Sequence, residues 1–262
     1  MKRVATGLLL GFLFIFLILY ATLFWLSVIV SLTVGLALFE YYRIVVSRDR
    51  GLLWLGTLLG ATVPIIIFLF GLKGFSGYLI FTVFFIFTYC LFIHDPLVSV
   101  TNRIGAGVLG IVYIAFSLSH LILLRNLEQG RMWLLFLIFI ISANDTCAYY
   151  AGRGIGRHKL APVVSPQKTV EGAFGGLTGG VLAALVFQHF FLPQILLQQT
   201  VALAILIGIL SQTSDLFESL IKRSAGVKDS GNILPGHGGA LDRIDSLIFP
   251  IPFLYYYLVI FK

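Results

Sequence analysis

The sequence predicts an all-α, polytopic membrane protein with about nine transmembrane helices and a cytoplasmic N-terminus. Composition is the first indication, because 59% of the 262 residues are hydrophobic and only 11% are charged. Soluble domains contain about 25% charged residues, so this chain has too few charges to cover a water-facing surface. The second is that the apolar runs have the length, about 20 residues, that a helix needs to cross a bilayer. The third is that these runs do not alternate between apolar and polar residues, as strands of a membrane barrel do.

The individual spans follow from the apolar runs between polar clusters. Met1-Lys2-Arg3 and the run behind it superficially resemble a signal peptide, but the run continues to about Tyr42 without a clear small-residue cleavage site. That pattern favours an uncleaved anchor followed by a second helix. The nine expected spans are roughly 4–20, 22–42, 52–70, 77–93, 104–124, 132–151, 173–192, 198–221 and 244–261.

The distribution of basic residues predicts the orientation. Alternate connections place 14 of the Lys and Arg residues on one side of the membrane and 4 on the other. Cytoplasmic loops carry the excess of Lys and Arg, so we expect the N-terminus inside and the C-terminus outside. Attraction to anionic headgroups accounts for Arg43, Arg48 and Arg50 in the loop after the second span. The absence of a long hydrophilic N-terminal extension favours a bacterial inner (plasma) membrane, with the active site on the cytoplasmic side.

The chain is expected to form one integrated fold. No repeat of 20–50 residues and no low-complexity linker separates it into independent domains. We expect residues 1–130 to form a helical scaffold that can supply dimer contacts, and residues 131–262 to form the catalytic region. Cys90 and Cys147 lie inside apolar segments and the histidines lack zinc-ligand spacing, so we predict neither a disulfide framework nor a zinc site.

A first polar cluster lies in the second half of the sixth span. It begins at Ser142-Ala143-Asn144-Asp145 and continues into the segment that follows the span. An aspartate inside an apolar helix costs about 2.5–3.5 kcal/mol on insertion scales, so it usually faces a cavity or a partner. The structural alternative is an ion pair with a neighbouring helix. We predict that the substrate-binding residues of this cluster are Asn144, Asp145, Arg153, Arg157 and Lys159.

A second cluster, 165–172, precedes the seventh span. Hydroxyl groups and a lysine at a helix start, together with free backbone N–H groups, suit an anion. Ser165 or Thr169 capping the helix, with Glu171 in its first turn, is the structural alternative. Capping does not explain Lys168, because a cation at the positive end of a helix is unfavourable unless an anion joins it. The predicted substrate-binding residues here are Ser165, Lys168, Thr169 and Glu171.

Three glycines in the seventh span predict close helix packing. Gly172, Gly176 and Gly180 are spaced by four residues and therefore share one face. Small residues on one face allow another membrane helix to approach closely. We expect packing rather than ligand contact at these positions.

The third cluster carries the most chemistry. Ser211, Asp215, Glu218 and Lys222 follow helical spacing at the end of the eighth span and form one polar stripe. A glycine-rich turn follows, in which Gly238 and Gly239 permit a close backbone approach to a ligand. The last span then opens with Asp242 and Asp245, which share a face. Carboxylates on two helices beside basic residues suit Mg²⁺, which prefers few carboxylates and substrate phosphates. An internal salt-bridge network is the structural alternative.

The end of this cluster and the loop after it form one long pattern, which reads Ser219-x-x-Lys222-Arg223-x4-Lys228-Asp229-Ser230-Gly231-x2-Leu234-Pro235-Gly236-His237-Gly238-Gly239-x2-Asp242-Arg243-x-Asp245. This pattern resembles the signature of phosphatidate cytidylyltransferases. The resemblance covers roughly residues 140–246 and also includes Asp145-Thr146, Gly152-Arg153-x-x-Gly156-Arg157 and the segment 165–172. Two departures are Gln167, where a second lysine is common, and Ala240, which is smaller than the usual aliphatic residue.

The resemblance implies transfer of the cytidylyl group of CTP to phosphatidic acid in the bilayer, with pyrophosphate as leaving group. It implies Mg²⁺ held by Asp215 and Asp242, a potassium ion as companion, and a homodimer; no nucleic acid partner is expected. Asp145 and Asp245 are supporting carboxylates, and His237 either donates to pyrophosphate or shapes the turn. The remaining predicted catalytic residues are Lys222, Arg223, Lys228, Asp229 and Arg243.

The residues also indicate which kind of catalysis to expect. A phosphate monoester has a second pKa near 6, so it is a ready nucleophile at neutral pH and needs no general base. Positioning and charge neutralisation are what such a reaction requires.

Two other functions fit parts of the pattern. One is a CTP-dependent cytidylyltransferase or kinase that acts on another membrane lipid, such as a polyprenol. The other is a transporter, which is disfavoured because transporter sites lie near the midplane, often in inverted repeats, whereas these charges crowd one face.

Overall fold

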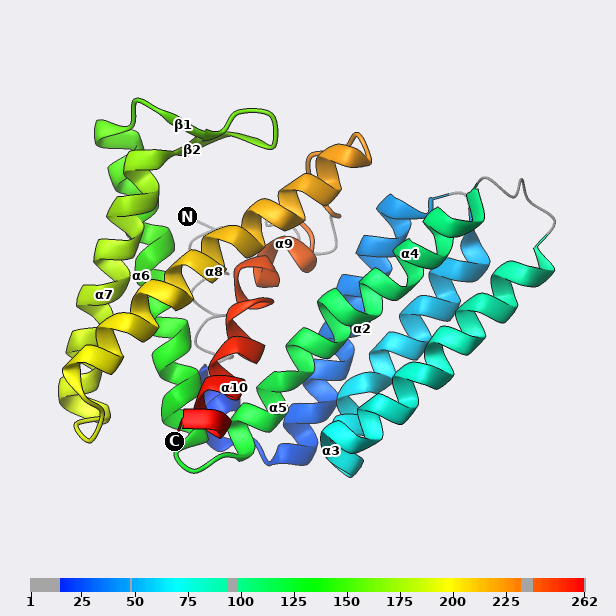
Figure 1. Cartoon of the computed structure of the whole chain (residues 1–262), viewed down its shortest axis with the longest axis horizontal. Coiled ribbons are helices and arrows are strands. Elements are labelled where there is room, and N and C mark those ends of the chain that lie inside the picture. Colours follow the sequence, from blue (N-terminus) through cyan, green and yellow to red (C-terminus); the bar gives the residue numbers. More distant parts are fainter. Residues whose placement is uncertain (1–14, 48, 94–98, 232–237, 262) are drawn as a thin grey trace. The chain divides into compact units, whose positions relative to one another are not determined.

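The computed structural model describes residues 15–47, 49–93, 99–231 and 238–261. Seven helical segments in these residues are long and apolar enough to cross a membrane (Figure 1). The described residues between them form short turns and loops and one β-hairpin. The predicted class, an all-α polytopic membrane protein, is therefore confirmed. The elements are α2 (Leu23–Val45), α3 (Arg50–Phe92), α4 (Val100–Gly110), the π-helix η2 (Ile111–Phe116), α5 (Ser117–Asn126), α6 (Gly130–Ile155), β1 (Lys159–Ala161), β2 (Ser165–Thr169), α7 (Val170–Phe191), α8 (Leu197–Ser224), α9 (Leu241–Ile244), the 3-10 helix η3 (Asp245–Leu247) and α10 (Pro250–Phe261).

The chain divides into two compact units. Unit 1 contains Met1–Asn126 together with Ser224–Ile244, and unit 2 contains Leu127–Arg223 together with Asp245–Lys262. The C-terminal signature segment is therefore shared between the units, since its loop and Asp242 belong to unit 1 while Asp215, Lys222 and Asp245 belong to unit 2.

Within unit 1, α3 folds back on itself. A straight helix of 43 residues would be about 65 Å long, yet the Tyr89 hydroxyl donates to Asp49 Oδ1 at 2.5 Å across the full length of the element. The Tyr78 hydroxyl likewise donates to the Leu59 carbonyl at 3.0 Å. The reversal occurs at Gly71, whose φ of 63° is in the left-handed region that glycine tolerates. The two arms (Figure 1) correspond to the separately predicted spans 52–70 and 77–93.

The predicted count of nine spans stays a prediction. The first expected span, 4–20, lies largely outside the described residues, of which 15–20 are helical. At the other end of the chain, the prediction of one continuous helix over 244–261 is wrong in detail. The span begins at Leu241 and is divided into α9, η3 and α10. Pro250 opens α10, where its missing N–H costs nothing because the first helical N–H groups have no partner within the helix.

Buried tyrosines fasten α2 to α4 in unit 1. The Tyr41 hydroxyl donates to the Ala106 carbonyl at 3.1 Å, and the Tyr42 hydroxyl donates to the Gly107 carbonyl at 2.6 Å. Both side chains are fully buried, and buried polar groups are stable only when they are hydrogen-bonded. The cytoplasmic end predicted for α2 is therefore held in a defined position.

In unit 2, α6 and α7 pack closely through glycine, as predicted. A Cβ added at Gly176 would approach the Asn144 carbonyl oxygen to 2.8 Å and the Ala148 Cβ to 2.9 Å, and one at Gly172 would approach the Ala148 carbonyl oxygen to 2.9 Å. These separations are too short for any larger residue, so the small face of α7 is what allows the two helices to approach.

A short β-hairpin between α6 and α7 was not predicted. Strands β1 and β2 pair antiparallel, with Lys159 opposite Thr169 and Ala161 opposite Ser165. A three-residue turn that includes Pro162 joins them. The second polar cluster, residues 165–172, lies on β2 and the first residues of α7.

Candidate functional site

The clearest charged contact in unit 2 joins two predicted site residues. Lys168 Nζ lies 2.7 Å from Asp215 Oδ2, and both side chains are partly exposed, at 26% and 35%. Lys168 is the second-last residue of β2, two residues before the start of α7, and Asp215 lies on α8. The anion that a lysine requires at the positive end of a helix is therefore, in this structure, the Asp215 carboxylate.

Further carboxylates surround this pair. Asp145 of α6 and Asp245 of η3 each lie close enough to Asp215 to interact with its charge. Glu218, one turn after Asp215 on α8, also acts on Asp245. Within unit 2, the structure thus brings together carboxylates from three different elements, all three of which were predicted to supply them.

The polar stripe of α8 faces the interior of unit 2. Glu218 is fully buried and its Oε2 lies 2.5 Å from Lys222 Nζ, whose side chain is 11% exposed. Ser214, also buried, donates its hydroxyl to the backbone carbonyl of Asp245. The short η3 segment is therefore tied to α8, which keeps the Asp245 carboxylate beside the others.

Asn144 belongs to an amide network that the sequence analysis missed in part. Gln212 Nε2 donates to Asn144 Oδ1 at 2.9 Å and to the Ala173 carbonyl at 3.1 Å, so three helices meet at one amide. Asn144 is fully buried. Gln212 was visible as an amide within an otherwise apolar helix, but only the fold shows that it faces α6 and α7.

The residues around the hairpin hold local structure. The Glu171 carboxylate accepts from the backbone N–H groups of Arg157 at 3.0 Å and His158 at 3.2 Å, and pairs with His158 Nδ1 at 2.6 Å. Thr169 Oγ1 accepts from Gly172 N at 3.1 Å, so the capping alternative is confirmed for Thr169. Ser165 does not cap the helix, because it begins β2. Substrate contact by these three residues stays a prediction.

Two arginines lie at the edges of this site. Arg153 Nη1 donates to the Tyr149 hydroxyl at 3.1 Å, and Arg223 Nε donates to the Val164 carbonyl at 3.3 Å. The second bond joins the end of α8 to the turn of the hairpin. Arg157 and Lys159 are exposed on the same hairpin region, where their charges are available to an anionic ligand.

In unit 1 the ends of the signature loop meet at Asp242. Its Oδ2 accepts from Ser230 N at 3.1 Å and from Gly239 N at 2.9 Å. Lys228, Asp229 and Arg243 are exposed nearby in the sequence, whereas Ser230 and Gly239 are buried. His237 lies outside the described residues, so its predicted role remains open, and Gly238 follows directly where the description resumes. The convergence of Asp215 and Asp242 on one metal ion stays a prediction, because the two residues belong to different units.

The donor set has the chemistry that Mg²⁺ prefers. All the candidate ligands are carboxylate oxygens. Among the described residues, no group of three or more acidic, histidine or cysteine side chains is arranged to hold a metal ion by itself. Mg²⁺ usually binds proteins through one or two carboxylates plus substrate phosphates and water. Its binding to this chain stays a prediction.

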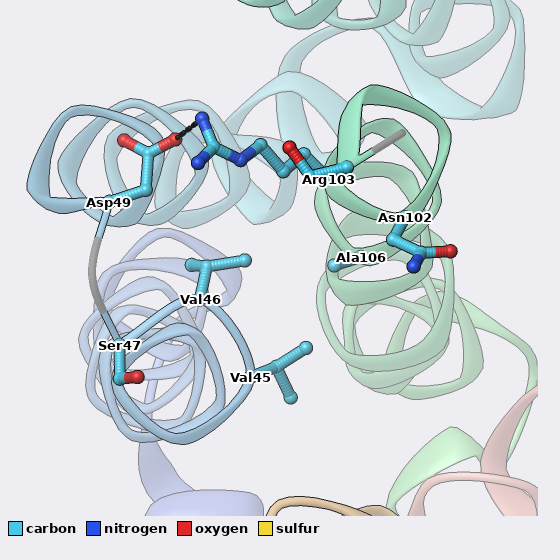
Figure 2. Close-up of a pocket in the computed structure, with 8 residues that line it drawn as sticks. Val45, Val46, Ser47, Asp49, Asn102, Arg103 and Ala106 are labelled. Atoms are coloured by element: carbon cyan, nitrogen blue, oxygen red, sulfur yellow. Dashed lines mark ion pairs between the residues drawn. The ribbon is translucent and has the colours of Figure 1, made fainter. Parts of the chain in front are cut away.

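A separate pocket of ≈ 280 Å³ in unit 1 contains none of the predicted site residues. Figure 2 shows the ion pair at its edge, in which Arg103 Nη1 lies 3.3 Å from Asp49 Oδ2. Asp49 also caps α3 by accepting from Leu52 N at 2.9 Å and accepts from the Tyr89 hydroxyl. The acid is thus part of a network that joins the start of α3 to its end and to α4. The lining residues are Val45, Val46, Ser47, Asp49, Ser99, Asn102, Arg103 and Ala106.

Comparisons with known proteins show the family of this chain. The cytidylyltransferase family model matches residues 1–261, and the chain therefore belongs to that family. The phosphatidate cytidylyltransferase of Bacillus subtilis is 35% identical over 271 residues, which cover 100% of this chain and 98% of that protein. The phosphatidate cytidylyltransferase of Staphylococcus epidermidis is 46% identical over 127 residues, 48% of this chain and 49% of that protein. An uncharacterized protein of Escherichia coli, YnbB, is 37% identical over 85% of this chain and 75% of its own length.

Proposed function

We propose that this protein is a phosphatidate cytidylyltransferase, which transfers the cytidylyl group of CTP to phosphatidic acid and releases pyrophosphate. The observation that carries the proposal is the match to this family over residues 1–261, with a phosphatidate cytidylyltransferase aligned over the whole chain. Unit 2 supports it as well, because the predicted site residues Lys168, Asp215 and Asp245 interact with one another or with Asp145 there.

The reaction joins a phosphate oxygen of phosphatidic acid to the α-phosphorus of CTP, while the bond from that phosphorus to the bridging oxygen of pyrophosphate breaks. The attacking phosphate is already largely dianionic at neutral pH, so no residue has to remove a proton from it. The chief obstacle is the negative charge of both substrates, which cations and backbone N–H groups must offset.

Lys168 is the residue best placed to offset that charge in unit 2. Its ammonium already lies against a carboxylate, at 2.7 Å from Asp215, and an arriving triphosphate offers it a more highly charged partner. Arg153, Arg157 and Lys159, at the end of α6 and on the hairpin, and Arg223, at the end of α8, carry the remaining positive charge. We propose that they hold the triphosphate, and that Lys222 chiefly balances buried Glu218.

We further propose that Asp215 and Asp242 are the ligands of Mg²⁺, with Asp145 and Asp245 supporting the first of them. When bound, the ion supplies neutralisation of phosphate charge; a potassium ion beside it is the companion expected for the family. Asp242 has a second function on this chain, because it accepts two backbone hydrogen bonds that close the signature loop.

The proposal also includes nine membrane crossings, a cytoplasmic N-terminus and site, a bacterial plasma membrane and a homodimer. The excess of Lys and Arg on one side supports the orientation.

The test is direct. Purified protein in phosphatidic acid vesicles receives Mg²⁺ and CTP labelled either at the α- or at the γ-phosphate. We expect α-label in the lipid and γ-label in pyrophosphate. Transfer of γ-label to a lipid would instead show a kinase. Transfer of α-label only to an acceptor other than phosphatidic acid would identify a cytidylyltransferase with a different lipid substrate.

A further inference from the structure

A buried acid in the N-terminal half contacts the signature loop. Glu40 lies on α2 and is 0% exposed. Its Oε2 accepts from the Ser230 hydroxyl at 3.0 Å and from the backbone N–H of Leu241 at 2.9 Å, two residues that are 190 and 201 positions away in the sequence. All of these residues belong to unit 1.

The two contacts bracket the signature loop at its two ends. Ser230 precedes the glycine-rich turn and Leu241 follows it, directly before Asp242. The backbone packs so closely on Glu40 that a Cβ at Gly231 would overlap Oε1 and a Cβ at Gly239 would overlap Oε2. Glycine at both positions is what allows the carboxylate to reach the backbone.

Neighbouring residues of α2 support the same contact. Arg43, about one turn after Glu40, donates from Nη2 to the Ser230 carbonyl at 3.0 Å. Orientation and attraction to lipid headgroups were the expected explanation of this arginine, and the structure adds a specific partner in the signature loop. Because Tyr41 and Tyr42 fasten α2 to α4, the helix that carries Glu40 is itself held in place.

The choice of a carboxylate is informative. Among the described residues, Glu40 Oε1 is buried and has no hydrogen-bond partner, and a buried polar atom without a hydrogen bond lowers stability. An apolar residue would fill the same space at lower cost to folding. A carboxyl oxygen, however, has two lone pairs and can accept two hydrogen bonds, and here one oxygen of Glu40 accepts from two segments of the same loop.

We propose that Glu40 is a positioning residue, which fixes the ends of the signature loop and thereby the orientation of Asp242 beside it. It acts on the reaction only through Ser230 and Leu241 and touches neither substrate. The inference rests on the proposed function for its kinetic part. The fastening of the loop by Glu40 can be tested without any turnover.

The kinetic experiment compares Glu40→Leu and Glu40→Gln with the wild-type, full-length enzyme in lipid vesicles. We expect Glu40→Leu to lower kcat roughly tenfold to a hundredfold, the range that loss of two buried hydrogen bonds produces, with the KM for phosphatidic acid unchanged. Glu40→Gln keeps a carbonyl acceptor and should recover part of kcat. Tyr41→Phe is the matched control, because it removes a buried hydrogen bond from the adjacent residue of α2 that faces α4 rather than the loop. A kcat for Glu40→Leu no lower than that of Tyr41→Phe would overturn the proposal.

The second experiment measures trypsin cleavage after Lys228, which is exposed just before the loop, relative to cleavage after Arg157, which is exposed in unit 2. We expect Glu40→Leu to speed cleavage at Lys228 alone. Tyr41→Phe should change neither site, because the Tyr42 hydrogen bond still holds α2 against α4. Unchanged cleavage at Lys228 would show that Glu40 does not hold the loop. This result is independent of whether the wild type transfers a cytidylyl group, which tests the proposed function.

If Glu40→Leu does not fold, the milder pair Glu40→Gln and Ser230→Ala decides the question. Residues that share one hydrogen bond show non-additive effects in a double-mutant cycle. We expect the double variant to have a kcat little lower than that of the worse single variant. Fully multiplicative losses would contradict the proposal.

Discussion

The pair formed by Lys168 and Asp215 allows activity to be separated from stability. Replacing Lys168 by Gln removes an ion pair of 2.7 Å whose side chains are 26% and 35% exposed. Partly exposed pairs of this kind contribute about 0–1 kcal/mol to folding because solvent screens them and two side chains must be ordered. The variant should therefore fold almost as well as the wild type.

The effect of the same change on turnover should be much larger. If Lys168 holds a phosphate of CTP, its loss removes a hydrogen bond to a charged group, which is worth about 1.5–3 kcal/mol. Each 1.4 kcal/mol corresponds to a factor of about 10, so we expect kcat/KM for CTP to fall by about 10-fold to 150-fold. Lys168→Arg should retain part of the activity, since it keeps the charge but not the shape of the ammonium.

The assay is formation of labelled lipid from CTP at several CTP concentrations, with the thermal unfolding midpoint measured on the same preparations. A large loss of stability with a proportional loss of activity would mean that Lys168 is a structural residue. Unchanged kcat/KM in a well-folded Lys168→Gln variant would refute its assignment as a phosphate ligand.

Two further changes test the structure around the site. Lys222→Met should destabilise the protein by about 3–5 kcal/mol, because it removes the cation that pairs with the fully buried Glu218. Unfolding in detergent measures this loss, and an unfolding midpoint equal to that of the wild type would show that Glu218 is not paired as described. Gly176→Val should destabilise the protein by about 1–3 kcal/mol, because it forces α7 away from Asn144 and Ala148. The control is Gly154→Val, where a Cβ would meet nothing within 4 Å, and equal effects of the two substitutions would argue against close packing of α6 on α7.

The sequence predicted the membrane helices better than it predicted the side-chain contacts between them. Membrane helices can be predicted because their length and apolarity follow from bilayer thickness alone, which is why the spans near 104–124, 132–151, 173–192 and 198–221 correspond to observed helices. The glycine face of α7 was predictable because its spacing is local. The small β-hairpin was not, since three- and five-residue strands leave no periodic pattern.

The contacts of Glu40 could not be predicted from the sequence. In Phe39-Glu40-Tyr41-Tyr42-Arg43 it looks like an ordinary charge near the end of a span, where lipid headgroups and water are close. Nothing local indicates that its partners are 190 and 201 residues away. The sharing of the signature segment between two compact units was equally invisible, because residue spacing within a motif does not report which unit a turn packs against.

The measurement that tests the central claim most directly is cytidylyl transfer to phosphatidic acid by Asp215→Asn and Asp242→Asn at limiting Mg²⁺. Asparagine keeps the size of the side chain and removes the charge, so both variants should insert and fold. If the two carboxylates bind the metal ion that holds the triphosphate, neither variant forms detectable CDP-diacylglycerol. Turnover near the wild-type rate by either folded variant would contradict the account.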